Sequence, residues 1–150
     1  MNIREAFPEC YPDNFLILMN KHDITNNKNI LKDDTVLYRV AKNGEINRET
    51  FISTYEEYVS GLIPDKDIDL DDLRTFSTSF DIKKSKIKKL LKMFNKSYPK
   101  AVAIEGTYCR NVGVAIKTID WKEGYNSDHH VDWWIYKDSL PEKLFNKCLE

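Results

Sequence analysis

The chain has 150 residues, which is the size of one domain and enough to bury a substantial core. Charged residues make up 31% of it, but the formal net charge is only −1, so bulk charge provides no attraction to nucleic acid or to a membrane surface. The composition is rich in aromatic residues and poor in glycine and proline, which argues against disorder.

The cysteines and the N-terminal sequence indicate the cellular compartment in which the protein is expected. Cys10, Cys109 and Cys148 are odd in number and far apart, which predicts free thiols in a reducing environment rather than a disulfide framework. The N-terminus has no apolar signal-peptide core, and no segment approaches the roughly 20 apolar residues of a membrane span. We therefore expect a cytoplasmic protein that does not contact a membrane.

The first third of the chain predicts a helix and then a strand. The helix runs over about residues 12–22, with Asp13 near its start, and the Asn-rich stretch 25–29 is a loop. Residues 35–40 alternate as a strand does, and the pattern places Arg39 on the face opposite Tyr38.

A second helix is expected from Asn47, which can accept hydrogen bonds from first-turn amides, to about Ser60. Apolar residues at helical spacing form its expected buried stripe. They are Phe51, Ile52, Tyr55, Val59 and Leu62. Gly61 and Pro64 end it.

The stretch 74–80, Arg-Thr-Phe-Ser-Thr-Ser-Phe, joins an acidic turn to a basic helix and has the composition of a strand. Phe76, Thr78 and Phe80 should share one face. Thr75, Ser77 and Ser79 should share the other. The stretch is either an ordinary amphipathic strand or the floor of a polar pocket.

The remaining elements complete the fold prediction. A helix is expected from an Asp81 cap to about Tyr98, and strands over 101–104, 112–119 and 130–136. Leu140–Leu149 is expected to be a closing helix with Pro141 in its first turn. This order predicts one compact α+β domain over residues 1–150, with a mixed or split sheet flanked by helices.

Metal sites are not expected. The acids Asp65, Asp67, Asp69 and Asp71 resemble a calcium loop only superficially, because Leu70 occupies the position of the required glycine and Phe76 that of the glutamate. In the stretch 128–132, only His130 and Asp132 point the same way from a strand, which is too few ligands for zinc.

The helix after residue 81 carries the strongest local charge. Its lysines are Lys83, Lys84, Lys86, Lys88, Lys89, Lys92 and Lys96. They could contact the phosphates of a nucleic acid or an acidic protein partner, or they could simply form a solvated helix face.

Three predicted strands supply polar residues that together suit a dinucleotide. Arg39 can hold a diphosphate through forked, charge-assisted hydrogen bonds. The hydroxyls of residues 77–79 can line a pocket, and His130 with Asp132 can bind a ribose hydroxyl or stabilise a developing cation. Trp133 or Tyr136 could stack on a base or on nicotinamide.

This order of residues resembles the ADP-ribosyltransferase superfamily, in which a strand arginine, a Ser-Thr-Ser strand and a later catalytic glutamate follow one another. The matching residues are Leu37-Tyr38-Arg39, Phe76-Ser77-Thr78-Ser79 and the turn Ile104-Glu105-Gly106-Thr107. The third part departs from the pattern, because His130-Val131-Asp132 replaces a Glu-x-Glu or Gln-x-Glu motif.

The resemblance implies an ADP-ribosyltransferase-like fold and NAD as the bound nucleotide. The residues that it places at the cofactor are Arg39, Ser77, Thr78, Ser79, Tyr38 and Trp133, and those at the catalytic position are Asp132 and His130. An active transferase, an NAD glycohydrolase and a nucleotide binder without activity all remain open, because Asp is one methylene shorter than Glu.

Residues 37–40, 51–58, 75–80 and 130–138 also resemble a family of small uncharacterised proteins from Gram-positive bacteria and their mobile elements. That similarity implies no activity. The alternative function is a non-catalytic binding protein, which acts on a protein or nucleic-acid partner through a pocket or through the lysine-rich helix.

Overall fold

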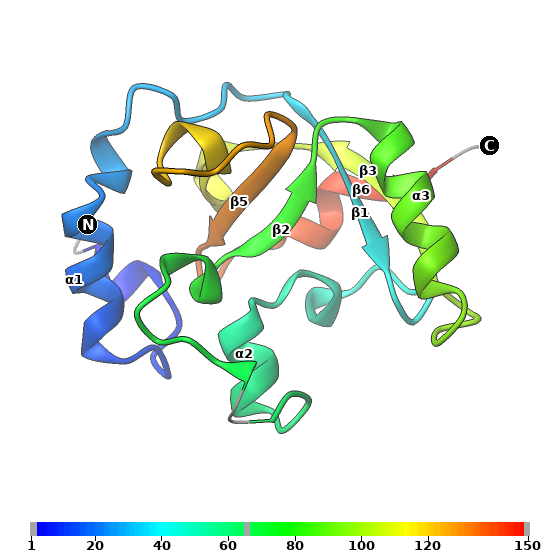
Figure 1. Cartoon of the computed structure of the whole chain (residues 1–150), viewed down its shortest axis with the longest axis horizontal. Helices are drawn as coiled ribbons and strands as arrows, with labels where there is room; N and C mark the ends of the chain where they lie inside the picture. The colour runs from blue at the N-terminus through cyan, green and yellow to red at the C-terminus, as the bar shows by residue number, and fades with distance from the viewer. Residues whose placement is uncertain (1–2, 65–66, 149–150) are drawn as a thin grey trace.

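A six-stranded antiparallel sheet forms the centre of the molecule (Figure 1). The structure is a computed structural model that describes residues 3–64 and 67–148. The strands are β1 (Val36–Ala41), β2 (Thr78–Asp81), β3 (Val102–Thr107), β4 (Gly113–Lys117), β5 (His130–Ile135) and β6 (Phe145–Lys147). Their order across the sheet is β4-β5-β2-β1-β3-β6, and every neighbouring pair is antiparallel.

The sheet is split between β1 and β2. These two strands pair only at Tyr38 and Asp81, whereas β1 and β3 pair along the whole of β1. Beyond that single pair they diverge, which Figure 1 shows in the centre of the molecule. The sheet therefore consists of two halves, β4-β5-β2 and β1-β3-β6. The predicted compact α+β domain is confirmed. Its one sheet is antiparallel rather than mixed, and it is weakly paired between β1 and β2.

Within the described residues, three α-helices accompany the sheet: α1 (Asp13–Lys21), α2 (Thr54–Val59) and α3 (Lys84–Phe94). α1 packs on one half of the sheet, where Phe15 lies in the same core cluster as Trp134 of β5. α3 packs on the other half, where Ile87 lies against Val40 of β1. In Figure 1 these two helices lie at opposite ends of the molecule, and α2 lies below the split.

α1 and α3 cover the same face of the sheet. Directly paired residues of an antiparallel ladder share a face, so the pairs Tyr38–Asp81 and Asp81–His130 place these three side chains together. Val40 and Trp134 follow at even spacing on their strands and belong to the same face. The candidate site lies where β1 and β2 separate, so that Arg39 and Phe80 from the opposite face line it together with Ser79 and His130 from this one.

The opposite face holds a second cluster of aromatic side chains. Trp133 is fully buried there, and its ring centroid lies 5.1 Å from that of Phe80 and 6.4 Å from that of Phe145. Phe145 also crosses Gly106 of β3, where an added Cβ would lie 2.5 Å from its Cγ. Gly106 therefore allows β6 to approach β3 closely.

The helix predicted from Asn47 to Ser60 is two elements rather than one. A 3-10 turn covers Arg48–Phe51, and α2 begins anew after Ser53. Ser53 and Glu56 form a reciprocal capping box: the Glu56 amide donates to Ser53 Oγ (3.1 Å), and the Ser53 amide donates to Glu56 Oε1 (3.0 Å). The break buries Phe51 completely but leaves Val59 53% exposed, so the predicted buried stripe was wrong for Val59 and also for Leu62.

The strand predicted over residues 74–80 begins later than expected. Leu73–Phe76 form a 3-10 turn, started by Asp72, whose Oδ1 accepts from the Arg74 amide (2.9 Å). Phe76 thus lies in the core beneath α1, and Phe80 lies in the cluster on the other face of the sheet. Asp81 ends β2 rather than beginning the next helix, although its Oδ1 accepts from the Lys83 amide (2.7 Å).

The predicted closing helix was wrong. After a short 3-10 turn at Pro141–Leu144, the chain extends into β6 and pairs with β3. The apolar residues have helical spacing, but hydrogen bonding to the otherwise unpaired edge of β3 favours the extended conformation, and β6 covers that edge. Leu149, the expected end of that helix, lies outside the described residues.

Candidate functional site

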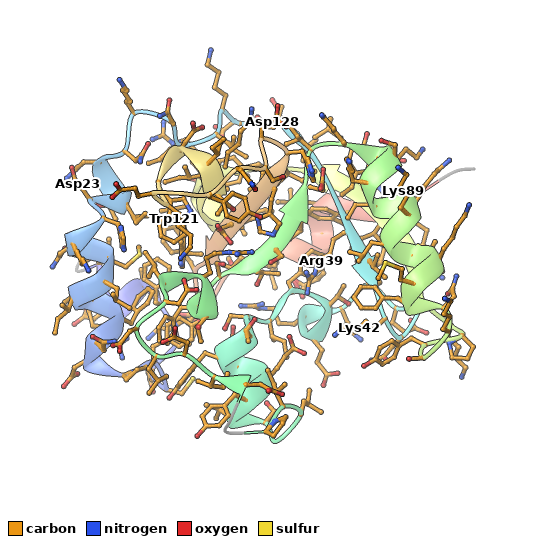
Figure 2. All side chains as sticks on the ribbon, viewed as in Figure 1. Asp23, Arg39, Lys42, Lys89, Trp121 and Asp128 are labelled. Carbon is orange, nitrogen blue, oxygen red and sulfur yellow. The ribbon has the colours of Figure 1, made fainter. Side chains whose placement is uncertain are left out.

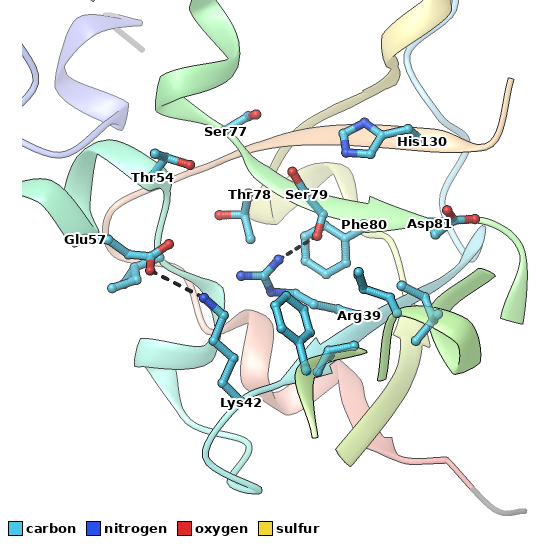
Figure 3. Close-up of a pocket in the computed structure, with 15 residues that line it drawn as sticks. Arg39, Lys42, Thr54, Glu57, Ser77, Thr78, Ser79, Phe80, Asp81 and His130 are labelled. Carbon is cyan, nitrogen blue, oxygen red and sulfur yellow. Dashed lines mark hydrogen bonds and ion pairs between the residues drawn. The ribbon is translucent and has the colours of Figure 1, made fainter. Parts of the chain in front are cut away.

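Arg39 bridges the gap that opens between β1 and β2. Its Nη1 donates to the Ser79 carbonyl of β2 (2.7 Å), and its Nε donates to the Thr50 carbonyl (2.8 Å), as Figure 3 shows for the first of these bonds. The guanidinium carbon also lies 5.6 Å from the ring centroid of Phe80. One side chain therefore occupies the place where ladder hydrogen bonds between the two strands would otherwise form.

A pocket of about 230 Å³ lies at this split (Figure 3). Of the residues that the sequence predicted as a site, five line it: Arg39, Ser77, Thr78, Ser79 and His130. The pocket brings these five residues together, but it does not include Asp132, the predicted catalytic carboxylate. Their roles in binding or catalysis remain predictions.

The three hydroxyls of the Ser-Thr-Ser strand have different partners. Thr78 is buried and donates to the Phe51 carbonyl (2.7 Å). Ser77 is buried and lies 2.9 Å from Asp132 Oδ1, to which it donates. Ser79 is exposed at the pocket. Ser79 is therefore the one of the three whose hydroxyl can contact a ligand directly.

A second, larger pocket of about 580 Å³ adjoins the first. The residues common to both are Arg39, Val40, Lys42, Ile52 and Glu57. At this junction Lys42 Nζ lies 3.9 Å from Glu57 Oε2, and Figure 3 shows the pair beside the Arg39 guanidinium. Two cations thus meet where the pockets join. No sequence pattern had singled out Lys42 or Glu57, because they come from a turn and from the misassigned helix.

The charge of Arg39 persists at neutral pH. Burial lowers the pKa of Arg39 from 12.5 to about 10, and the nearby negative charge of Glu57 acts in the opposite direction. The guanidinium is therefore protonated around pH 7. A half-buried cation with two carbonyl contacts is a suitable partner for an anionic group.

Asp132 lies behind the pocket rather than in it. It is fully buried and accepts from Ser77 Oγ (2.9 Å), Thr118 Oγ1 (2.6 Å) and Trp121 Nε1 (3.0 Å). Arg74 Nε lies 3.5 Å from its Oδ1. A carboxylate with this many donors and no exposed surface cannot touch a ligand in this conformation.

Asp132 is connected to His130 through Thr118. The Thr118 hydroxyl has one proton, which it donates to Asp132, so the short contact with His130 Nδ1 (2.6 Å) assigns the proton there to the imidazole. His130 Nε2 is then an acceptor, 3.5 Å from Arg74 Nη2. Burial is the main cause that lowers the pKa of His130 below 6.5; Arg74 acts in the same direction and Asp132 opposes it.

Two of the predicted contact residues do not face the pocket. Trp133 is fully buried among Phe80, Tyr108 and Phe145, so the stacking role predicted for it was wrong for this conformation. Tyr38 packs against the core beneath α3, and it is not among the residues that line either pocket. The side chains of β5 alternate between faces, and the face that carries His130 does not carry Trp133.

The acidic stretch has a structural role in the described residues. Asp69 accepts from the Thr75 hydroxyl through its carbonyl (2.6 Å) and from the Asp71 amide through Oδ1 (2.9 Å). Asp65 lies outside the described residues. Within 3–64 and 67–148, no three His, Cys, Asp or Glu side chains form a group that could hold a metal.

Two further observations concern the rest of the chain. In the part that the structure describes, no helix combines the length and the apolar character that crossing a bilayer requires. No protein-family model, curated protein or solved structure matches the chain.

Replacing Asp132 by Asn should lower the free energy of unfolding by about 2–4 kcal/mol, because the amide removes the charge that three hydrogen-bond donors and the Arg74 guanidinium face, and turns an N–H toward one of the donors. Chemical denaturation measures this loss. Asp128→Asn is the matched control, since Asp128 is 73% exposed and pairs with Lys83 at 3.8 Å; its loss should stay below about 1 kcal/mol. Equal losses would contradict the network described for Asp132.

The partly buried His130 should make the fold sensitive to acid, because burial lowers its pKa. An unfolded histidine titrates near pH 6.5, so below about that pH the unfolded chain binds a proton that folded His130 resists. The free energy of unfolding should therefore fall as the pH is lowered from about 7 to 5.5, and His130→Gln should flatten the curve. The control His22→Gln retains His130, so the part of the acid-induced fall in the free energy of unfolding that His130 causes should remain. A flat wild-type curve would contradict the prediction.

Proposed function

We propose that this chain is an ADP-ribosyltransferase-like protein that binds NAD or a related nucleotide in the split between β1 and β2. The observation that carries the proposal is the meeting of Arg39 with Ser77–Ser79 at one pocket, on the two strands that flank the split. The same residues carry the resemblance of the sequence to that superfamily. The split sheet agrees with the fold that the resemblance implies.

The sizes of the two pockets suit a dinucleotide better than a mononucleotide fragment. Small-molecule sites usually measure about 300–1,000 Å³, and the pocket of about 230 Å³ alone falls below that range. The adjoining pocket of about 580 Å³ brings the site into it. A ligand that spans both must pass Arg39 and Lys42 at the junction, which is where a diphosphate belongs.

In this arrangement the nicotinamide riboside half occupies the smaller pocket, beside Ser79 and His130. The adenosine half occupies the larger pocket, whose amides and hydroxyls include those of Asn43, Asn47 and Thr50. Glu57 lies at the junction and can accept from a ribose hydroxyl once Lys42 turns to the diphosphate.

The chemistry would be cleavage of the bond between C1′ of the ribose and the nicotinamide nitrogen. The bonding electron pair leaves with nicotinamide, C1′ develops positive charge, and an acceptor oxygen or nitrogen adds there and loses a proton. Neutral His130 takes that proton on Nε2 once the contact of this nitrogen with Arg74 Nη2 (3.5 Å) is released. Water as acceptor makes the protein an NAD glycohydrolase, and a macromolecular acceptor makes it a transferase.

Asp132 acts here as a positioning residue. Through Thr118 it fixes the tautomer of His130, and through Ser77 it fixes the start of β2. Its negative charge lies close behind the pocket and would favour the developing cation electrostatically. The catalytic contact that a glutamate would make in this superfamily is therefore replaced by an indirect one.

NAD should stabilise the wild-type protein. At about one hundred times the dissociation constant, binding adds about 2.7 kcal/mol to the free energy of unfolding, or about 5–10 °C in Tm for a chain of this size. Thermal denaturation at millimolar NAD measures the shift, and the absence of any shift would refute the nucleotide site.

Arg39→Ala should abolish that shift, and Lys42→Gln, which leaves the carbonyl contacts of Arg39 intact, should reduce it. Lys89→Gln removes the same charge from the exposed face of α3 and serves as the control, with an unchanged shift expected. If Lys42→Gln and Lys89→Gln behave alike, the diphosphate is not held at the junction.

An enzyme and a non-catalytic binder differ in nicotinamide release from NAD, followed by chromatography. If the chain is an enzyme, His130→Gln should lower kcat by about 10²–10⁴-fold with little change in NAD affinity. Release that persists in His130→Gln would contradict its role as base. The absence of release by a wild-type protein that does bind NAD would identify a binder.

A further inference from the structure

Ser79 carries the hydroxyl of the Ser-Thr-Ser strand that is not used by the protein itself. Ser77 donates its proton to Asp132, and Thr78 donates its proton to the Phe51 carbonyl. Among the described residues, nothing forms a hydrogen bond with the Ser79 hydroxyl, which is exposed at the pocket. This hydroxyl therefore keeps its proton and both lone pairs for a molecule that enters the pocket.

The backbone of Ser79 is held on both sides of β2. On one side Ser79 pairs with Asp132 of β5 in the antiparallel ladder. On the other side the Arg39 guanidinium donates to the Ser79 carbonyl (2.7 Å), and in Figure 2 Arg39 lies at the centre of the molecule, next to β2. A rigid strand thus carries the free hydroxyl, so little conformational entropy is lost when a reacting group meets it.

His130 lies beside this hydroxyl. Ser79 pairs with Asp132, two residues along β5 from His130, so Ser79 and His130 are diagonal neighbours on one face of the sheet. Both line the pocket of about 230 Å³, and Figure 3 shows the Ser79 hydroxyl on the same side of β2 as the His130 ring. Thr54 and Glu57 line the same pocket from α2, on the side away from His130 (Figure 3). Ser79 is therefore the nucleophile best placed to lose its proton to His130.

We propose that Ser79 is itself an acceptor, so that the chain transfers ADP-ribose from NAD to its own Ser79 hydroxyl. This inference rests on the proposed function, because NAD must first bind beside Ser79. The bond between C1′ and the nicotinamide nitrogen breaks, and its electron pair leaves with nicotinamide. Ser79 Oγ forms a bond to C1′, and its proton passes to His130 Nε2, directly or through one water molecule.

An acceptor that is part of the pocket has an advantage over an acceptor from solution. Well-oriented groups within one molecule react as if they were present at about 10⁵–10⁸ M, which exceeds the concentration of water. The product also fills the site, because ADP-ribose attached to Ser79 occupies both pockets and passes Arg39 and Lys42 at their junction. Each chain therefore reacts once and then binds no further NAD.

The test is incubation of the whole chain with NAD, followed by intact-mass spectrometry, peptide sequencing and chromatography of nicotinamide. One ADP-ribose group per chain should appear, and it should lie on Ser79. Nicotinamide should be released in a burst equal to the amount of protein and then nearly cease, and the rate constant of this burst is the quantity that His130→Gln lowers. Because the transfer occurs within one chain, that rate constant should not change when the protein is diluted.

Ser79→Ala should lose the label, whereas Ser85→Ala, the same change at an exposed position of α3, should keep it. Ser79→Cys should retain the label as a thioglycoside, which mercuric ion cleaves, whereas the oxygen-linked label of the wild type should resist mercuric ion. This variant separates an acceptor from a residue that only supports the fold, because only an acceptor changes the chemistry of the linkage. The wild-type label should also resist hydroxylamine, which removes ADP-ribose from carboxylates such as Glu57.

Several results would overturn this inference. They are a label on a residue other than Ser79, a label that hydroxylamine removes, or a rate constant that rises with protein concentration. If NAD raises the Tm but no label forms, the inference fails while the nucleotide site stands. If NAD neither raises the Tm nor labels the chain, the proposed function fails together with the inference.

Discussion

The contact of Arg39 with two backbone carbonyls is the interaction on which the architecture of the site depends. β1 and β2 share a single residue pair, so the ends of these strands would separate with unpaired polar groups on both sides. The guanidinium donates to the Ser79 and Thr50 carbonyls and joins the two halves of the sheet across the gap. A lysine could not do the same, because it lacks the planar fork that addresses two acceptors at once.

The same side chain contributes a positive charge to the pocket, so its structural and proposed ligand-binding roles cannot be fully separated. Burial favours the neutral form of Arg39, yet a pKa of about 10 still leaves it charged at neutral pH. Lys42 and Glu57 belong only to the pockets and not to the joint between the strands. Substitutions there report on ligand contacts with less disturbance of the sheet.

The buried carboxylate of Asp132 organises the other side of the pocket. It accepts hydrogen bonds from the Ser77 and Thr118 hydroxyls and the Trp121 indole, and it faces the Arg74 guanidinium; these partners come from the segment just before β2 and from the stretch that follows β4. A negative charge without exposed surface requires such a set of partners, because desolvation would otherwise be too costly. The consequence is a neutral His130 with a fixed tautomer at the pocket surface.

Local patterns in the sequence were sufficient for several of the elements and for part of the site. The periodicity around Phe15 predicted α1, and the alternation around Arg39 and His130 predicted β1 and β5. Order along the chain then brought Arg39, Ser79 and His130 to one pocket correctly.

The predictions that failed concern residues whose positions depend on contacts between distant segments. Two of the hydrogen bonds that Asp132 accepts come from Thr118 and Trp121, and no local sequence motif connects these residues with Asp132. Trp133 was expected at the ligand, but the tight alternation of β5 directs it to the opposite face. The last helix was wrong because pairing with the edge of β3 decided the conformation of residues 145–147, and that edge is not visible from the residues themselves.

The strand order also determines how the chain can fold. β1 is translated early, yet its neighbours β2 and β3 follow much later, and β2 must wait for β5 before both its edges are covered. Contacts between such distant segments slow folding, because loop-closure entropy is lost before the contacts form. During synthesis β1 therefore remains an unpaired strand until the segments of β2 and β3 have been made, and an unpaired strand edge is prone to aggregation.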